Sequence, residues 1–295
     1  MLVHLPPYRV EAVAHALPST GIDWSISAYG LPALWSRHQG AGVRVGILDT
    51  GIDPTHTDLA GAVVGYHNLT KDCTPYDTNG HGTHVAGVVG ARGQMRGVAP
   101  QCEILSVKVL GNNGTGSLEG VANGVLFALE SGCHIIVMSL GAPAITKNLE
   151  AAIRKASVAG VTIVCAAGND GGRVSYPAAM EETIAVGAVD RDGKVCEFSC
   201  RGKEIDVAAP GAEITSCWIG GGYATLSGTS MAAPFVGGVL TLAASDVKNH
   251  LLGHHARPIL KNTSTDVGEP GHDPLYGWGL VNPASVLDGS SKVIV

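Results

Sequence analysis

Five short and almost uninterrupted apolar runs constrain the fold of this chain more than any other feature of its sequence. They are rich in valine and isoleucine and span residues 43–48, 104–110, 135–139, 161–167 and 183–189. Strands buried on both faces have this pattern, whereas a strand with one solvent-exposed face alternates between apolar and polar residues. Helical patterns fall between the runs, near 82–91, 117–130 and 147–159. We therefore expect an α/β fold of three layers, with a mostly parallel central sheet covered by helices on both faces.

The chain is long enough for one large domain of this kind. Its 295 residues are 45% hydrophobic, which suffices for a sizeable core and excludes global disorder. The formal net charge is -6 and Lys and Arg do not cluster, so we expect no nucleic-acid or membrane partner. No apolar run reaches the roughly 18 residues that span a bilayer. We assign residues 1–20 to an N-terminal extension and residues 21–295 to the domain.

Seven cysteines are spread along the chain, an odd number that leaves at least one thiol unpaired. Cys165 lies inside an apolar run, where a free thiol packs like a small hydrophobic side chain. Cys196 and Cys200 could pair or bind a metal, but no second pair of ligands follows at zinc spacing, so free thiols are favoured. The first residues also lack the charged and apolar segments of a signal peptide. These features predict a reducing, cytoplasmic location.

Three polar segments follow or open the predicted elements and carry residues that could do chemistry. Asp49 comes directly after a buried run, His81 opens a helical pattern, and Ser230 opens a longer one that runs from Thr229 to Ala244. In a parallel sheet, catalytic groups gather where the strands end. We therefore expect these residues to converge although they lie far apart in the sequence.

Together, these side chains can form a nucleophile that none of them forms alone. A serine hydroxyl attacks poorly at its free pKa and needs an adjacent base, and that base needs a carboxylate to orient it. His81 is the expected base and Asp49 the expected orienting group. Ser230, at the start of a helix, can also turn its backbone N–H toward a developing oxyanion. Asn169 follows another buried run and can supply the second oxyanion donor.

Each of these residues has a more ordinary interpretation when it is taken alone. Asp49 would then be a turn or helix-capping residue, and Ser230 a helix cap. His81 or His84 would be a structural histidine. The set as a whole favours catalysis over these roles. His84 stays structural in this interpretation, because it lies one position short of the spacing that a metal-binding histidine pair on a helix would use.

Four segments of the chain resemble the motifs of the subtilase family, in that family's order. They are residues 49–53, 81–87, 166–170 and 228–234, and the resemblance extends over roughly residues 30–285. The chain order Asp, His, Ser is the one found in subtilisin. The resemblance implies a subtilisin-like fold and a serine endopeptidase that hydrolyses polypeptides, with broad specificity, through an acyl-enzyme intermediate. It implies no organic cofactor.

Two other functions compete with this one. A catalytically silent subtilase would act as a binding module, but the triad and Asn169 are all present. A hydrolase of another α/β family would carry its nucleophile in a Gly-x-Ser-x-Gly elbow and order its triad Ser, Asp, His. The segment Gly228-Thr229-Ser230 does not fit that elbow.

The resemblance also implies where a substrate peptide binds. In this family two short segments hold the substrate between them as an antiparallel strand, which is recognition by strand addition. The S1 pocket takes the side chain that precedes the cleaved bond. The residues carried over are Gly114, Thr115, Gly116 and Leu118 on one side, Ser139, Leu140 and Gly141 on the other, and Ala166, Ala167, Gly168 and Ser175 around S1. All are uncharged, so we expect uncharged side chains in S1.

The family's metal sites are carried over only in part. Residues 90–97 are short, basic and without carboxylates, so we expect no tight calcium site there, although Asp58 matches one of its ligands. A weakly bound calcium or sodium ion is the one cofactor expected. Its ligands would be the carbonyls of Ala178, Met180 and Thr183 with the side chains of Glu204 and Asp206. These could equally be ordinary surface carboxylates. A homodimer is a further hypothesis.

The N-terminal extension holds one more motif. Leu5-Pro6-Pro7-Tyr8 resembles the Leu-Ile-Pro-Tyr element of intracellular subtilisins, in which a short extension blocks the active site. The resemblance implies an inhibitory extension here. Proline has no N–H and a fixed φ, so two in a row would bend the segment and hold its peptide bond out of line with Ser230. A disordered tail is the alternative.

Overall fold

The computed structural model describes residues 1–14, 21–246 and 252–293. Its centre is a seven-stranded sheet in the order β10-β9-β8-β7-β3-β5-β4, in which every neighbouring pair is parallel. The strands are β3 (Arg44–Asp49), β4 (Val63–Asn68), β5 (Glu103–Lys108), β7 (Ile135–Met138), β8 (Thr162–Ala166), β9 (Ile184–Val189) and β10 (Ile205–Pro210). The predicted α/β fold with a parallel central sheet is confirmed.

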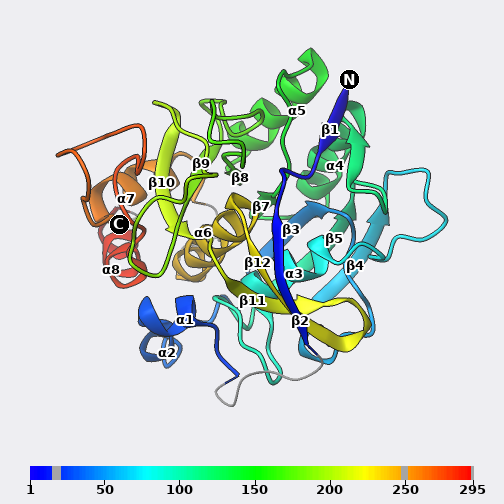
Figure 1. Cartoon of the computed structure of the whole chain (residues 1–295), viewed down its shortest axis with the longest axis horizontal. Helices are drawn as coiled ribbons and strands as arrows, with labels where there is room; N and C mark the ends of the chain where they lie inside the picture. The colour runs from blue at the N-terminus through cyan, green and yellow to red at the C-terminus, as the bar shows by residue number, and fades with distance from the viewer. Residues whose placement is uncertain (15–20, 247–251, 294–295) are drawn as a thin grey trace.

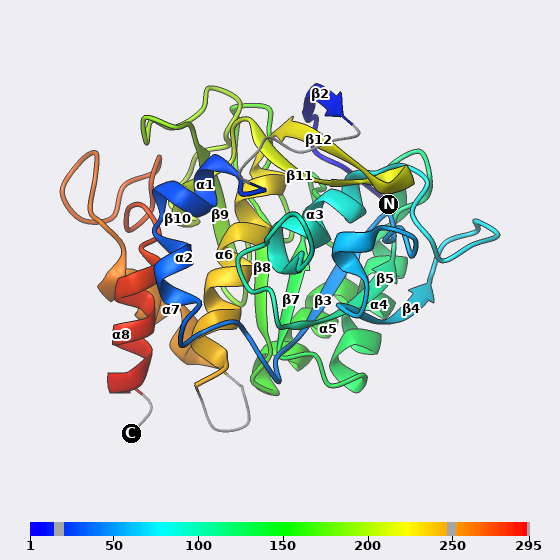
Figure 2. The ribbon, with the colours of Figure 1, turned by 90° about the horizontal axis from the view of Figure 1, so that it is seen from below.

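Helices cover both faces of this sheet and complete the three layers (Figure 1). The first face carries α3 (His81–Gly90) and α6 (Thr229–Ala244), and the second carries α4 (Leu118–Glu130) and α5 (Lys147–Val158). In both views α1 (Trp24–Ala28), α2 (Leu31–Leu34), α7 (Ala256–Thr263) and α8 (Pro283–Val293) gather at the β10 side of the molecule (Figure 2). Short 3-10 turns lie at η1 (Thr57–Leu59), η2 (Ile219–Gly221) and η4 (Gly253–His255). Among the described residues, no helix has the length and apolar character needed to cross a bilayer.

Side chains of the central strands alternate between two apolar clusters, one under each helical layer. Val45, Ile47 and Val137 belong to the cluster that includes the buried residues of α3 and α6. Leu48 and Ile136 belong to the cluster that includes those of α4 and α5. Successive residues of a strand point to opposite faces, so a sheet covered twice needs apolar residues at every position. This is why these strands have continuous apolar runs in the sequence.

Two smaller antiparallel sheets both contain part of the extension, and only the one next to residues 114–116 was expected from the sequence. In the first, β11 (Ile214–Trp218), β12 (Gly222–Ser227) and β2 (Arg9–Ala14) pair in that order. In the second, β1 (Leu2–His4) pairs with β6 (Thr115–Ser117). Residues 1–14 therefore form two strands on the body of the protein rather than a disordered tail.

All seven cysteines are free thiols, as the sequence analysis favoured. Six of them are buried and Cys73 is exposed. Burial raises the pKa of the Cys102 and Cys133 thiols to about 12, so these side chains stay protonated and pack as small apolar groups.

Helix α6 crosses the core, and all sixteen of its residues are buried. It can do so because Gly237 and Gly238 let the helix backbone approach its neighbours closely. A Cβ atom at Gly238 would lie 2.5 Å from the Cβ of Val98, and one at Gly237 would lie 2.7 Å from Cγ2 of Val137. Such distances are too short for carbon atoms, so a side chain at either position would force the packed elements apart.

Substitution Gly238→Ala is therefore expected to destabilise the fold. Overpacking of a close-packed core costs about 1–3 kcal/mol, which lowers the Tm of a domain of this size by several degrees. Thermal unfolding, followed in a proteolytically inactive background, measures the effect. The control is Val158→Ala on α5, where the side chain is 79% exposed and the Tm should not move. Equal Tm values for the two variants would contradict this account of α6.

Candidate active site

Asp49 and His81 form a buried hydrogen-bonded pair at the carboxyl end of β3. Nδ1 of His81 donates to Oδ1 of Asp49 at 2.8 Å and lies 3.0 Å from Oδ2. The backbone N–H of Thr50 donates to Oδ1 at 2.7 Å and fixes the carboxylate. Both side chains are almost fully excluded from solvent. A carboxylate only accepts, so Nδ1 carries the proton and Nε2 is the nitrogen that can take one from a nucleophile.

A second carboxylate holds the two loops of this pair together. Oδ1 of Asp77 accepts the hydroxyl of Thr50 at 2.9 Å, and Oδ2 accepts both the backbone N–H and the hydroxyl of Thr83 on α3. The hydroxyl of Thr50 in turn accepts the N–H of Gly82 at 3.0 Å. Asp77 thus fixes the start of α3 against the end of β3. The sequence analysis missed this residue, because nothing in a single sequence sets it apart from an aspartate in a surface turn.

A fully buried lysine supports the same loop. Nζ of Lys108, on β5, donates to the carbonyl of Thr50 at 2.6 Å and to Oδ1 of Asn112 at 3.1 Å. It also pairs with Asp72 at 3.2 Å. A buried ammonium is stable only when its protons are matched in this way.

Ser230 is the second residue of α6, and its position depends on a break in the helix hydrogen bonds. Pro234 lies four residues further along and has no N–H to donate to the Ser230 carbonyl. The hydroxyl of Ser139, at the end of β7, donates to that carbonyl at 2.9 Å instead. The nucleophile is thereby anchored to the central sheet. Within the described part of the chain, Oγ of Ser230 and Nε2 of His81 have no hydrogen-bond partner.

The amide of Asn169 is held with its N–H₂ group facing the active site. Its Oδ1 accepts the backbone N–H of Thr229 at 2.8 Å and the Thr229 hydroxyl at 2.7 Å. Nδ2 is therefore the donor end, as an oxyanion site requires. Gly228 makes room for it, because a Cβ there would lie 2.9 Å from Nδ2. Thr229 was not singled out from the sequence, and it is the residue that fixes the amide.

The extension lies along the predicted substrate groove (Figure 1). His4 exchanges two backbone hydrogen bonds with Gly141, and the N–H of Leu5 donates to the carbonyl of Gly114 at 3.0 Å. Strand β1 therefore lies between the two segments that the sequence analysis assigned as groove walls. Val3 is fully buried in the same apolar cluster as Leu118, the residue assigned to an outer subsite.

The centre of the extension covers the catalytic residues. Nδ2 of Asn169 donates to the carbonyl oxygen of Pro7 at 2.8 Å. The ring of Tyr8 packs over that of His81, with 5.0 Å between their centroids. Burial, together with the charges of Asp49 and Asp77, raises the pKa of Tyr8, so this phenol is neutral where it shields the triad. Pro6 and Pro7 have no N–H, and strand pairing resumes only at Arg9.

A cavity of about 430 Å³ lies where S1 was predicted. Gly141, Gly168 and Ser175 line it, whereas the other residues assigned to this region are buried behind its wall: Ser139, Leu140, Ala166 and Ala167. Two charged residues, Asp170 and Arg173, also line the cavity. The expectation of uncharged side chains in S1 rested on the residues carried over from the family and did not include these two charges, so it stays a prediction.

One buried thiol sets the position of this charge. Sγ of Cys200 lies at the same cavity and donates to Oδ1 of Asp170 at 2.9 Å. This hydrogen bond, with one from the backbone of Gly172, lowers the pKa of the Asp170 carboxyl, which is therefore ionised at the rim of the pocket.

Two of the residues predicted to hold a weak cation, Thr183 and Asp206, bind a guanidinium group of the chain itself. Arg257 donates through Nε to Oδ1 of Asp206 at 2.6 Å and through Nη2 to the carbonyl of Thr183 at 2.6 Å. The hydroxyl of Thr183 lies 3.2 Å from the carbonyl oxygen of Ala178 and 3.0 Å from that of Met180, and its one proton is donated within this group of carbonyls. Because Arg257 already occupies the Asp206 carboxylate and the Thr183 carbonyl, the arrangement does not fit a calcium or sodium ion. Binding of such an ion stays a prediction, and no chemistry below depends on it.

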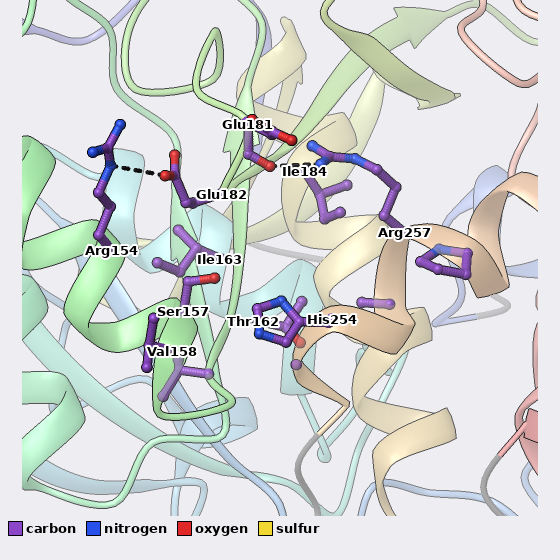
Figure 3. A pocket seen from close by; sticks show the side chains of 14 residues that line it. Arg154, Ser157, Val158, Thr162, Ile163, Glu181, Glu182, Ile184, His254 and Arg257 are labelled. Carbon is purple, nitrogen blue, oxygen red and sulfur yellow. Dashed lines mark hydrogen bonds and ion pairs between the residues drawn. The ribbon is translucent and has the colours of Figure 1, made fainter.

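Arg257 also lines a cavity of about 580 Å³ between α5, β9 and α7 (Figure 3). Arg154 and Glu182 pair across one side of it at 2.9 Å, and His254 lies at the other. The cavity lies near the amino ends of β8 and β9, whereas the triad lies near the carboxyl ends of the strands. Groups that react in such sheets gather at the carboxyl ends of the strands, so this cavity is not part of the active site.

Asp58, the one residue that matches a ligand of a tight calcium site, has its own donors. Its two oxygens accept the N–H groups of Gln94 and Met95 and the hydroxyl of Tyr223. His56 and Cys217 lie near enough to complete a metal set, within 4.8 Å. The nitrogens of His56 are both hydrogen-bonded to backbone groups, and burial raises the pKa of the Cys217 thiol well above its usual value. The cluster is satisfied without a metal.

Comparisons with known proteins identify the family of the chain. Residues 40–279 match the model of the Subtilase family, Peptidase_S8. The chain is 42% identical to Subtilisin Savinase of Lederbergia lenta over 267 residues, which are 88% of this chain and 97% of that protein. It is 41% identical to the Thermostable alkaline protease of Halalkalibacterium halodurans over 278 residues, 92% of this chain and 75% of the relative.

A third relative, the Intracellular serine protease of Paenibacillus polymyxa, is 39% identical over 254 residues, 81% of this chain and 77% of that protein. A carboxylate, an imidazole, a hydroxyl and an amide donor meet at one edge of the sheet, and the family match spans most of the chain. The chain therefore belongs to the subtilase family and is a subtilisin-type serine endopeptidase.

Proposed function

We propose that this endopeptidase degrades polypeptides of varied sequence inside the cell, and that residues 1–14 keep it inactive until the extension is cut. The observation that carries the proposal is the bond from Asn169 to the Pro7 carbonyl. A peptide of the chain itself is thereby held at the proposed oxyanion donor, flanked by strand pairing on both sides. A segment bound in this way competes directly with a substrate.

The proposed roles follow from the geometry of the site. Ser230 attacks the substrate carbonyl carbon as its proton passes to Nε2 of His81, and Asp49 stabilises the imidazolium that results. The Asn169 amide and the Ser230 N–H stabilise the negative oxygen of the tetrahedral intermediate. His81 then gives the proton to the leaving amine, and water hydrolyses the acyl-enzyme by the same steps. Only main-chain atoms of the substrate are needed, which supports broad specificity.

The prolines explain why the bound extension resists cleavage. Strand pairing with the groove ends at the Leu5 N–H, and the two residues that follow have fixed φ angles and no N–H. The carbonyl of Pro7 reaches Asn169, but the prolines end the strand pairing just before it. The segment therefore does not continue as a substrate strand would, so its peptide bond is held out of line with Ser230 and is spared.

An intracellular role has two supports. One relative with 39% identity carries the name Intracellular serine protease, and the chain keeps seven free thiols, six of them buried. Reduced thiols persist in the cytosol and are exposed to oxidation elsewhere. Fractionation of the producing cells, followed by immunodetection, tests this role, and enzyme found only in the culture medium would contradict it.

Substitution Ser230→Ala is expected to abolish proteolysis while the fold stays intact. In subtilisin itself, loss of the serine nucleophile costs roughly 10⁶ in kcat, and we expect a loss of that order here. Casein hydrolysis measures the activity and circular dichroism the fold. A sulfonyl fluoride should label the unsubstituted protein at Ser230. Near-normal turnover in the variant would overturn the assignment.

Substitution Asn169→Ala is expected to lower kcat far more than it changes KM. The amide N–H donates to an oxygen that gains its full negative charge only in the transition state. In subtilisin itself the corresponding loss is roughly 10²–10³ in kcat. Asn169→Asp is the matched variant, since it keeps the acceptor for Thr229 and removes the donor. If Asn169→Asp retained full kcat, the oxyanion donor would lie elsewhere.

Cutting the extension is expected to activate the enzyme. The test replaces residues 15–20 by a recognition sequence for an added protease, so that the intact chain folds first and is then cut. A tethered segment has an effective concentration of millimolar order, and a free peptide of fourteen residues is lost on dilution. Hydrolysis of a short peptide should therefore rise at least about tenfold after the cut. The control carries Ser230→Ala, and equal activity before and after the cut would contradict inhibition.

A further inference from the structure

We propose that the edge of β12 (Gly222–Ser227) is a binding site for the part of a substrate that follows the cleaved bond, and that it reaches as far as the seventh residue. Residues after the cleaved bond are here called P1′, P2′ and so on. The site would take unfolded polypeptide through its main chain, whatever its side chains. This inference rests on the proposed function, because it uses the extension as a stand-in for a substrate.

The pairing of β2 with β12 carries the inference. The register is antiparallel and pairs Arg9 with Ser227, Val10 with Leu226, Ala12 with Thr225, Val13 with Ala224 and Ala14 with Tyr223. Strand β11 occupies the other side of β12. Without the extension, β12 is therefore an edge strand with open N–H and C=O groups, which is a template for another extended chain. It ends three residues before Ser230.

The direction of the extension matches that of a substrate. The carbonyl of Pro7 lies at Asn169, where the carbonyl before the cleaved bond belongs. Tyr8 then stands for P1′, Arg9 for P2′ and Ala14 for P7′. In Figure 1 this blue segment continues without reversal from β1 past the active site to β2 beside β12. A substrate with the same polarity meets the same edge.

The contact depends on the main chain more than on side chains. All six residues of β2 are exposed, with Val10 47% and Val13 57% accessible. A side-chain hydrogen bond also joins the two strands, from the hydroxyl of Ser227 to Oε1 of Glu11 at 3.1 Å. Strand addition of this kind gains its affinity from backbone hydrogen bonds. The substrate class is thus any extended stretch with about seven residues beyond the cleaved bond, which a folded surface rarely presents.

The test uses the folded chain after the extension has been cut and removed. A series of peptides shares one sequence up to the cleaved bond and carries from two to eight alanine or serine residues after it. The value of kcat/KM should rise with length up to P7′ by at least about tenfold and then level off, since each net hydrogen bond contributes modestly. The register shifts at Glu11, so N-methylation should reduce kcat/KM at alternate positions on each side of P4′ rather than at every position, because antiparallel pairs alternate in their bonding.

The outcomes separate the two proposals. Equal kcat/KM from two residues onward, with cleavage intact, overturns the β12 site and leaves the endopeptidase standing. No cleavage of the longest peptide overturns both.

A second measurement needs no cut enzyme. In the intact Ser230→Ala chain, Ala12→Pro or Val13→Pro should speed hydrogen exchange of backbone amides in residues 222–227 at least about tenfold, whereas Val13→Thr should not. Unchanged exchange in both proline variants overturns main-chain pairing at this edge.

Discussion

Two hydrogen bonds at the first turn of α6 hold the reactive end of the molecule in place. Asn169 accepts from the Thr229 backbone, and Ser139 donates to the Ser230 carbonyl that Pro234 leaves without its helix donor. Each joins the helix to the end of a strand in the central sheet. Because α6 is buried along its whole length, it cannot shift to relieve a poor fit. Ser230 and Asn169 are therefore held as rigidly as the packed core to which they are attached.

The same groove geometry explains both catalysis and its restraint. In the proposed function the enzyme binds main-chain atoms and tolerates many substrate sequences, and for that reason an extended segment of the chain itself also serves as a ligand. In the proposed inhibition, the extension binds the groove as a substrate would and has two prolines where strand geometry has to continue. Val3 and Leu5 secure the segment on one side of the cleaved bond, and the backbone of β2 secures it on the other. Neither half depends on a charged contact with the triad.

The sequence predicted the elements whose residues face apolar surroundings on every side. The buried runs at 43–48 and 135–139 belong to strands sandwiched between helices, where mainly apolar residues pack. Strand β10 escaped prediction because Asp206 and Pro210 interrupt its apolar pattern, and the partner that neutralises Asp206 is the distant Arg257. Strand β12 was not predicted from the sequence. Its edge pairs through backbone atoms, and such pairing requires no particular pattern of side chains.

The catalytic residues could be predicted because their chemistry requires rare combinations, while their supports could not. An aspartate, a histidine and a serine seldom occur together in these motifs unless they form a catalytic triad. Asp77 and Thr229 are ordinary residues that matter only through partners from other elements. The charge of Asp170 at S1 also depends on a distant partner. Its carboxylate is held at that pocket by a hydrogen bond from Cys200, thirty residues away in the chain. Residues that act through such contacts become visible only when the fold brings the partners together, so the specificity of this enzyme was less predictable than its reaction.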